Sequence, residues 1–256
     1  NKAINLYKLE KLEEAELIYN NLLSKKENLP QVLYYLSLLK NKQGKTEEAK
    51  SLLSQSISLD SKFYLAQYNL GYLMLSSNDL KQAKELFIKT IELKQGFAPA
   101  YTNLAYIYSN ENNFEEAIIN YLKAIESNPN FLDNYINLSD LFLKLTRNTE
   151  AEILLEKAFK LFKNNLNISL NLTNVYIKNN KLQEADKLLR EILIFNLNNS
   201  VIHYYLAIVA TKIGNINSAI LNYTKSIIIE PNFLEAYINL SQIIIKFIDN
   251  NTNQSF

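Results

Sequence analysis

The sequence has few of the residues on which disulfides, metal sites and tight turns depend. Among 256 residues it has no cysteine and no tryptophan, one histidine, four glycines and four prolines. Without cysteine, the chain can form no disulfide, no thiolate nucleophile and no cysteine-based metal site. With so few glycines and prolines, it lacks the residues that tight β-turns require. We therefore expect a chain with few such turns.

Charge and hydropathy exclude further classes of protein. The net charge is +1, so no overall field favours nucleic acid or an anionic membrane as a partner. No apolar run approaches the roughly 20 residues of a membrane span, and the start does not resemble a signal peptide. These absences lead us to expect a cytoplasmic protein that binds neither nucleic acid nor membrane. Because residue 1 is Asn rather than Met, we also expect the natural N-terminus to lie upstream.

The sequence has a strict repeat instead. Alanine recurs every 34 residues, with no insertion, at Ala15, Ala49, Ala83, Ala117, Ala151, Ala185 and Ala219. We number each repeat so that this alanine is position 20. The expected units are then a partial repeat at 1–29, complete repeats at 30–63, 64–97, 98–131, 132–165 (degenerate), 166–199 and 200–233, and a partial repeat with a polar tail at 234–256.

Each repeat contains two stripes of apolar residues at helical spacing. In the repeat that begins at residue 98, the first stripe is Tyr101, Leu104, Ala105 and Tyr108, and the second is Phe114, Ala117, Tyr121 and Ala124. Residues three and four apart share one face of a helix, so each repeat is predicted to be a helix–turn–helix pair.

The glycines and prolines fit this frame. Gly44 and Gly214 occupy position 15, in the predicted turn between the two helices. Pro129 and Pro231 follow second helices, and Pro30 stands at the start of a first helix, as does Pro99. No glycine is left over for a phosphate-binding loop.

The segment AYTNLAYIYSNENNFEEAIINYLKAIESNPNF closely resembles a tetratricopeptide repeat (TPR) in its aromatic, Leu, small, Tyr, Ala and Pro positions. The resemblance extends over the whole chain. It implies an all-α, right-handed superhelical solenoid of antiparallel helix pairs, with the first helices lining the concave face. The sequence departs from the family pattern at Thr173, which replaces a small residue. Lys163 and Leu197 replace the usual proline, so we expect looser turns there.

Few residues suggest catalysis or metal binding. His203 occupies the aromatic position 4 of its repeat, so we expect it to be packed rather than catalytic, and it has no partners at a zinc-ligand spacing. Acidic pairs such as Glu47–Glu48 and Glu115–Glu116 begin second helices, where carboxylates interact well with the helix dipole. We therefore predict a chain that is not itself an enzyme, with no catalytic residue, no cofactor and no metal.

The face of the first helix opposite its apolar stripe is unusual at position 6. Five of the seven repeats have asparagine there: Asn69, Asn103, Asn137, Asn171 and Asn239. With 36 asparagines in 256 residues, chance would place about one among seven positions, and asparagine is a mediocre helix former. Its amide can both donate to and accept from the backbone of an extended peptide. We therefore hypothesise an asparagine ladder that binds a peptide. The alternative, that asparagine is simply common at this position, stays open.

This ladder resembles the concave surface of the TPR arm in O-linked N-acetylglucosamine transferase-like proteins. That resemblance implies peptide-binding roles for the five asparagines. On the same face, the candidate peptide-binding residues also include two tyrosines and an asparagine at position 9 and three lysines at position 13: Tyr72, Tyr106, Asn174, Lys144, Lys178 and Lys212. The lysines, with Lys246 beyond them, would suit acidic peptides. They could equally be solvated cations at helix C-termini.

The last predicted helix, from Leu234 to Asp249, has apolar residues on both faces, at Ile243, Ile244, Ile245, Phe247 and Ile248. Such a surface indicates an interaction or a missing neighbour, so we expect the chain to be part of a longer protein. We predict a protein-interaction scaffold that binds an extended peptide or partner protein. The alternative is the substrate-docking arm of a glycosyltransferase, sulfotransferase or methyltransferase whose C-terminal catalytic domain lies outside this sequence. A third hypothesis is self-association through the ends.

Overall fold

The computed structural model describes the backbone of residues 2–252 and the side chains of residues 2–246. Throughout that part of the chain the regular structure is α-helix, without a strand, which confirms the prediction of an all-α repeat fold. The chain divides into two compact units, residues 1–129 and 130–256, which we describe separately. None of the described helices is both long and apolar enough to cross a lipid bilayer.

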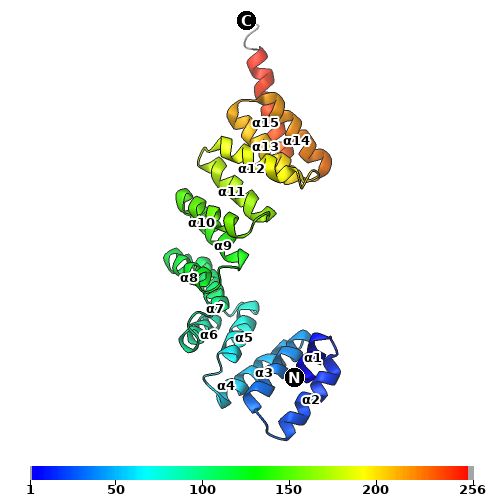
Figure 1. Ribbon diagram of the computed structural model, residues 1–256, viewed down its shortest axis with the longest axis vertical. Helices are drawn as coiled ribbons and strands as arrows, with labels where there is room; N and C mark the ends of the chain where they lie inside the picture. Colours follow the sequence, from blue (N-terminus) through cyan, green and yellow to red (C-terminus); the bar gives the residue numbers. More distant parts are fainter. Residues whose placement is uncertain (1, 253–256) are drawn as a thin grey trace. The chain divides into compact units, whose positions relative to one another are not determined.

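Helices α1 to α8 form unit 1 (Figure 1). Their bounds are α1 Lys2–Lys8, α2 Leu12–Ser24, α3 Leu29–Lys42, α4 Thr46–Leu59, α5 Tyr64–Ser76, α6 Leu80–Leu93, α7 Ala98–Asn110 and α8 Phe114–Ser127. Each odd-numbered helix is the first helix of a repeat and packs against the helix that follows it. Each second helix also contacts the first helix of the next repeat within the unit, so the core is continuous from one repeat to the next.

Unit 2 has the same order (Figure 1). Its helices are α9 Leu132–Lys144, α10 Asn148–Leu161, α11 Leu166–Lys178, α12 Leu182–Leu193, α13 Ser200–Ile213, α14 Ile216–Ile229 and α15 Leu234–Thr252. Helix α15 continues to Thr252, past the end expected at Asp249, and no glycine or proline in this stretch stops it. Ile243 is buried and Ile244 and Ile245 are exposed. The side chains of Phe247 and Ile248 lie outside the described residues.

Small residues set the distance between helices. The repeated alanine at position 20 is completely buried in all seven repeats. At position 8 of α5, a Cβ on Gly71 would lie 2.9 Å from Cε1 of Phe87 on α6, so only glycine fits without a shift. The larger Thr173 is accommodated at position 8 of α11, where it is buried and donates a hydrogen bond to the Ser169 carbonyl at 2.8 Å.

The turn between the two helices of a repeat has one residue in the left-handed conformation, always at position 15. Their φ angles lie between 57° and 86°, and the residues are Glu10, Gly44, Asn78, Asn112, Thr146, Asn180 and Gly214. Glycine and asparagine adopt this conformation at low cost. A turn was predicted between the two helices of each repeat, and the structure adds that the residue at position 15 of each of these seven turns is left-handed.

Candidate functional site

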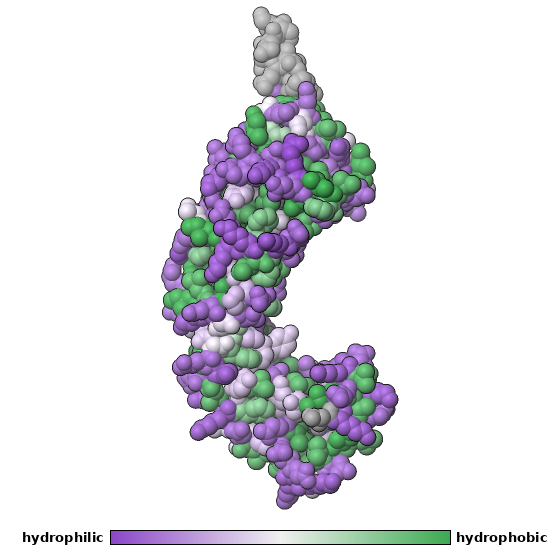
Figure 2. All heavy atoms as spheres, viewed as in Figure 1, coloured by the Kyte–Doolittle hydropathy of each residue, from purple (hydrophilic) through white to green (hydrophobic). Residues whose placement is uncertain are grey.

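Positions 6, 9 and 13 of the first helices are exposed or half-buried, and we call the surface that they form the first-helix face of each unit. In unit 1 it carries Asn69 and Tyr72 on α5 and Asn103 and Tyr106 on α7. Both tyrosines are 49% exposed, whereas the two asparagines are half-buried. The visible surface of each unit mixes hydrophobic and hydrophilic residues (Figure 2), so composition alone does not mark this face.

The position-6 asparagines of unit 1 form hydrogen bonds between repeats. The Nδ2 atom of Asn69 donates to the Tyr34 hydroxyl at 3.4 Å and to the Leu65 carbonyl at 2.8 Å. In the next repeat, Nδ2 of Asn103 donates to the Tyr68 hydroxyl at 3.3 Å. Each tyrosine occupies position 5 of the preceding repeat. The amide of Asn69 therefore has both N–H groups engaged, and its Oδ1 is the atom left to accept a bond from a ligand.

In unit 2, one position-6 asparagine is hydrogen-bonded to the preceding repeat and two are not. Nδ2 of Asn239 on α15 donates to the Tyr204 hydroxyl at 3.2 Å, as in unit 1. The residue 35 positions before Asn171 is Ile136, which has no hydroxyl. Among the described residues, the side-chain amides of Asn137 and Asn171 form no hydrogen bond; Asn137 is exposed and Asn171 is half-buried. These two amides keep donor and acceptor available to a ligand.

Helix α11 contacts both α9 and α13, so position 6 of three successive repeats lies on neighbouring helices. Tyr205 takes this position on α13. Burial raises the pKa of Tyr205, and nearby Tyr204 and the Asp140 carboxylate on α9 raise it further.

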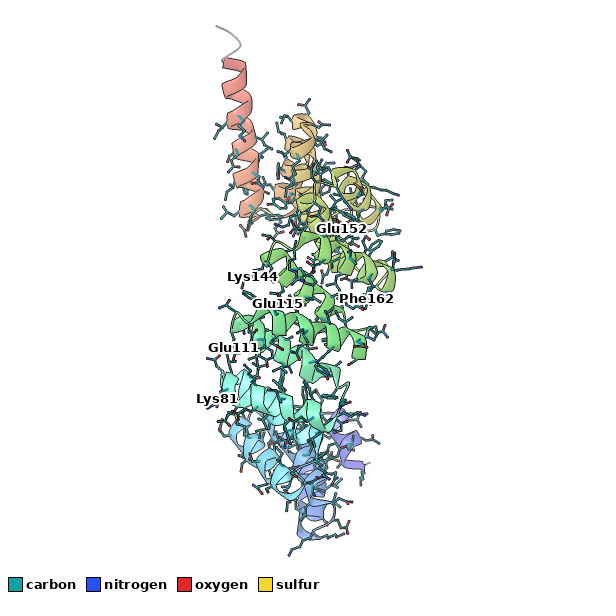
Figure 3. The ribbon with its side chains drawn as sticks, turned by 90° about the vertical axis from the view of Figure 1, so that its left-hand side faces the viewer. Lys81, Glu111, Glu115, Lys144, Glu152 and Phe162 are labelled. Atoms are coloured by element: carbon teal, nitrogen blue, oxygen red, sulfur yellow. The ribbon has the colours of Figure 1, made fainter. Side chains whose placement is uncertain are left out.

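The candidate lysines lie at the C-terminal ends of the first helices. Lys144, labelled in Figure 3, ends α9, Lys178 ends α11, and Lys212 lies in the last turn of α13; all three are exposed. Lys178 and Lys212 form no ion pair with any described residue. Asn174 is half-buried on α11 between Asn171 and Lys178. The structure therefore places these predicted residues on the first-helix face of unit 2.

Two titratable side chains buried elsewhere, His203 and Glu152, have structural partners. His203 is 6% exposed, with Nδ1 at 3.2 Å from Oδ1 of Asn222 and Nε2 at 3.4 Å from the Leu197 carbonyl, so it is packed as predicted. Glu152 on α10, labelled in Figure 3, pairs with Lys181 and accepts a hydrogen bond from Asn179 at 2.6 Å. Burial alone would raise the pKa of Glu152, but these two donors outweigh it and lower the pKa. Neither group is a catalytic candidate.

Sequence reasoning missed the tyrosines at position 5. Tyr34, Tyr68 and Tyr204 each precede a position-6 asparagine by 35 residues, and this is the signal that could have revealed the pairing. Asn69, Asn103 and Asn239 therefore also have a structural role, in addition to the binding role hypothesised for them.

Comparison with known proteins identifies the repeat. Two models described as "Tetratricopeptide repeat" match, one over residues 98–131 and the other over residues 40–105 and 142–208. Among curated proteins, the search finds no match to this sequence.

Several solved structures share the fold. The C-terminal part of a TPR repeat-containing protein from Cytophaga hutchinsonii is 15% identical, with a TM-score of 0.76, over 93% of this chain and 98% of that one. YrrB, described as a TPR protein with an unusual peptide-binding site, is 20% identical, with a TM-score of 0.63, over 73% of this chain and 96% of that one. The complex Cut9–Hcn1 is 18% identical, with a TM-score of 0.59, over 94% of this chain and 48% of that one. At these identities the similarity establishes the fold alone.

Proposed function

Because the chain belongs to the tetratricopeptide repeat family, we propose that it is a scaffold that binds an extended peptide or partner protein along the first-helix faces of its units. The single observation that carries this proposal is the recurrence of asparagine at position 6 on a surface that the packing of the repeats leaves accessible. YrrB, of similar fold, is described as having a peptide-binding site, which supports a peptide as the class of ligand.

The proposed mechanism is capture of the peptide backbone. An amide side chain can satisfy a backbone N–H or C=O whatever the sequence of the peptide, because every non-proline residue carries both groups. Asn137 and Asn171, on contacting helices and without a hydrogen bond of their own, would each donate and accept. Asn69, whose N–H groups are both engaged, would act only as an acceptor for a peptide N–H. Asn103 would keep one N–H free, whereas the amide of Asn239 interacts with the hydroxyl of Tyr223 as well as that of Tyr204.

Selectivity would come from the residues beside the asparagines. In unit 1, exposed Tyr72 and Tyr106 would act as apolar anchors with a polar tip, a role in which tyrosine is common at interfaces. In unit 2, Lys144, Lys178 and Lys212 would favour acidic residues in the partner, with Asn174 between them. The net charge of +1 and the interspersed carboxylates favour protein over nucleic acid as the partner.

The docking-arm hypothesis uses the same surface, and its asparagine ladder resembles that of O-linked N-acetylglucosamine transferase-like proteins. It differs from a free-standing scaffold only in having a catalytic domain in the same protein. Sequencing the reading frame beyond Phe256 separates the two: a transferase domain supports the docking arm, and an early stop codon contradicts it.

The test begins with capture of a partner on the immobilised chain. Its affinity is then measured for the wild type and for the triple variant Asn103→Ala, Asn137→Ala, Asn171→Ala. The matched control replaces three exposed asparagines on second helices, Asn20, Asn21 and Asn217. We expect the ladder variant to bind at least tenfold more weakly, with unchanged helicity, and the control to bind like wild type. Equal affinity for the two variants would refute the proposal.

A further inference from the structure

A groove of about 480 Å³ lies between α13, α14 and α15 in unit 2. Its apolar part is formed by Ile208, Ile216, Tyr223 and Ile243, and its polar part by Thr211, Lys212, Asn239, Gln242 and Lys246. Asn239, Gln242 and Lys246 occupy positions 6, 9 and 13 of their repeat, so this groove is part of the first-helix face.

The groove is open because of the residue at position 6. One repeat earlier, Tyr205 packs against the apolar cluster of α11, α12 and α13 that includes Ile177, Leu182, Leu189 and Val209. The residues 34 positions later are Thr211, Ile216, Tyr223 and Ile243, and all four line the groove. Here position 6 is Asn239, whose shorter side chain is held by the Tyr204 hydroxyl. The space that a tyrosine ring fills in one repeat is therefore available to a ligand in the next.

The charged residues that line the groove are all positive. Lys212 from α13 and Lys246 from α15 line it, both are exposed, and neither forms an ion pair within the part of the chain whose side chains are described. No aspartate or glutamate is among the lining residues. Gln242 adds an amide donor, whereas the hydroxyl of Thr211 donates to the Ala207 carbonyl at 2.8 Å. Two cations without an ion pair and one neutral donor beside an apolar floor suit a carboxylate attached to, or next to, an apolar group.

We propose that this groove binds an internal glutamate of an extended peptide, with the bulky apolar side chain next to it on the floor. The proposal deepens the proposed function and rests on it for the peptide nature of the ligand. The glutamate carboxylate lies between Lys212 and Lys246, and the apolar neighbour contacts Ile216, Tyr223 and Ile243. An internal residue is favoured over a peptide C-terminus because the first-helix face continues from the groove onto α13 and α11. A bound peptide would therefore extend past the groove along this face.

The test uses three fluorescein-labelled peptides and fluorescence anisotropy. The first is Gly-Ser-Gly-Leu-Glu-Leu-Gly-Ser-Gly with an amidated C-terminus, the second has Gln in place of Glu, and the third has that Gln and ends in a free Leu carboxylate. We expect wild type to bind the Glu peptide about five- to tenfold more tightly than the other two, the range expected for one carboxylate between two accessible cations. Equal binding of the Glu and Gln peptides would overturn the proposal, as would tightest binding of the free carboxylate.

Variants of the groove sharpen the test. In Lys212→Gln, Lys246→Gln the preference for Glu should disappear, whereas the exposed Lys225→Gln on α14 serves as the charge-matched control and should keep it. Asn239→Tyr should abolish binding of all three peptides by filling the groove, and it should fold because Tyr205 occupies the equivalent place. Asn239→Ala leaves the groove open but removes a backbone contact, so it should weaken all three peptides alike and keep the ratio between Glu and Gln. A preference that survives in the double lysine variant or in Asn239→Tyr would overturn the proposal.

Failure of this proposal is distinguishable from failure of the proposed function. If none of the peptides binds, or if Glu and Gln bind alike, the acidic subsite is refuted. The captured partner would still respond to replacement of Asn103, Asn137 and Asn171 if the scaffold function holds.

Discussion

The side-chain amide of Asn239 donates a hydrogen bond to the hydroxyl of Tyr204, 3.2 Å away on the first helix of the preceding repeat. The same relationship joins Asn69 to Tyr34 and, one repeat further, Asn103 to Tyr68. In each case the two residues are 35 positions apart, which is one repeat of 34 residues plus one position. A single interaction therefore couples adjacent first helices and also fixes the orientation of an amide on the surface proposed to bind a peptide.

This pairing predicts a coupling energy. Tyr204→Phe and Asn239→Ala should each destabilise the chain by about 0.5–1.5 kcal/mol, the net contribution of a typical hydrogen bond. The double variant should cost less than the sum of the two, because both remove the same bond. The measurement is urea unfolding of the four proteins followed by circular dichroism. Exposed Tyr72→Phe, which has no such partner, is the control, and simple additivity would show that the bond contributes nothing.

The turn at Thr146 predicts a stabilising substitution. Thr146 has a φ of 59°, and a β-branched residue in the left-handed region is strained. Thr146→Gly should therefore raise the free energy of unfolding by about 1 kcal/mol. The reciprocal change Asn112→Thr, where φ is 57°, should lower it by a similar amount. Melting temperatures of the two variants should move in opposite directions, and a loss of stability in Thr146→Gly would contradict the strain.

The close approach of Gly71 to the Phe87 ring predicts that even alanine at position 71 destabilises the fold. Alanine is the better helix former, but its Cβ would lie 2.9 Å from the ring of Phe87. Gly71→Ala should therefore lower stability by about 1–3 kcal/mol, as overpacked cores do. Adding Phe87→Leu to that variant should cost less than Phe87→Leu does alone, because it relieves the overlap. Thermal unfolding of the four proteins distinguishes this from a gain in helix propensity, which would raise the melting temperature of Gly71→Ala.

The buried tyrosines predict loss of stability in alkali. Burial, with smaller effects from Glu156 and other carboxylates, raises the pKa of Tyr176 to about 12. A group whose pKa is higher in the folded state contributes stability below its unfolded pKa of about 10, and this is lost as the pH rises toward 12. Stability should therefore fall between pH 10 and 12, and more gently in Tyr176→Phe. Unfolding midpoints at each pH provide the test, and identical pH profiles would contradict it.

The sequence predicts the helices, their pairing and the places of proline because each depends on local pattern. Apolar residues three and four apart define the stripes, and Pro30 lies in the first turn of α3, as expected. A turn was predicted in each repeat, but its left-handed residue was not, since only two of these seven residues are glycine. Asn78 and Thr146 occupy the same turn because the helix ends on both sides impose it. No propensity of threonine indicates it.

The part of the candidate site that depends on a local pattern could be predicted from the sequence. Position 6 stands out because asparagine recurs there on one face of the first helices. The bond from Asn239 to Tyr204 depends on how two helices from different repeats meet, and the groove beside it depends on the difference in size between asparagine and tyrosine. The 35-residue spacing of tyrosine and asparagine hints at the bond, but the contact itself and the size of the groove depend on how the helices are placed in space.

The central claim, that amides on the first-helix face bind a peptide backbone, is tested most directly by removing backbone N–H groups from the captured partner peptide. Its affinity, with and without N-methylation at alternate residues, should be measured for wild type and for the Asn103→Ala, Asn137→Ala, Asn171→Ala variant. The account predicts that methylation weakens binding to wild type by about tenfold, roughly the loss of two hydrogen bonds, and has little further effect on the variant. Equal weakening in both proteins, or none in wild type, would contradict it.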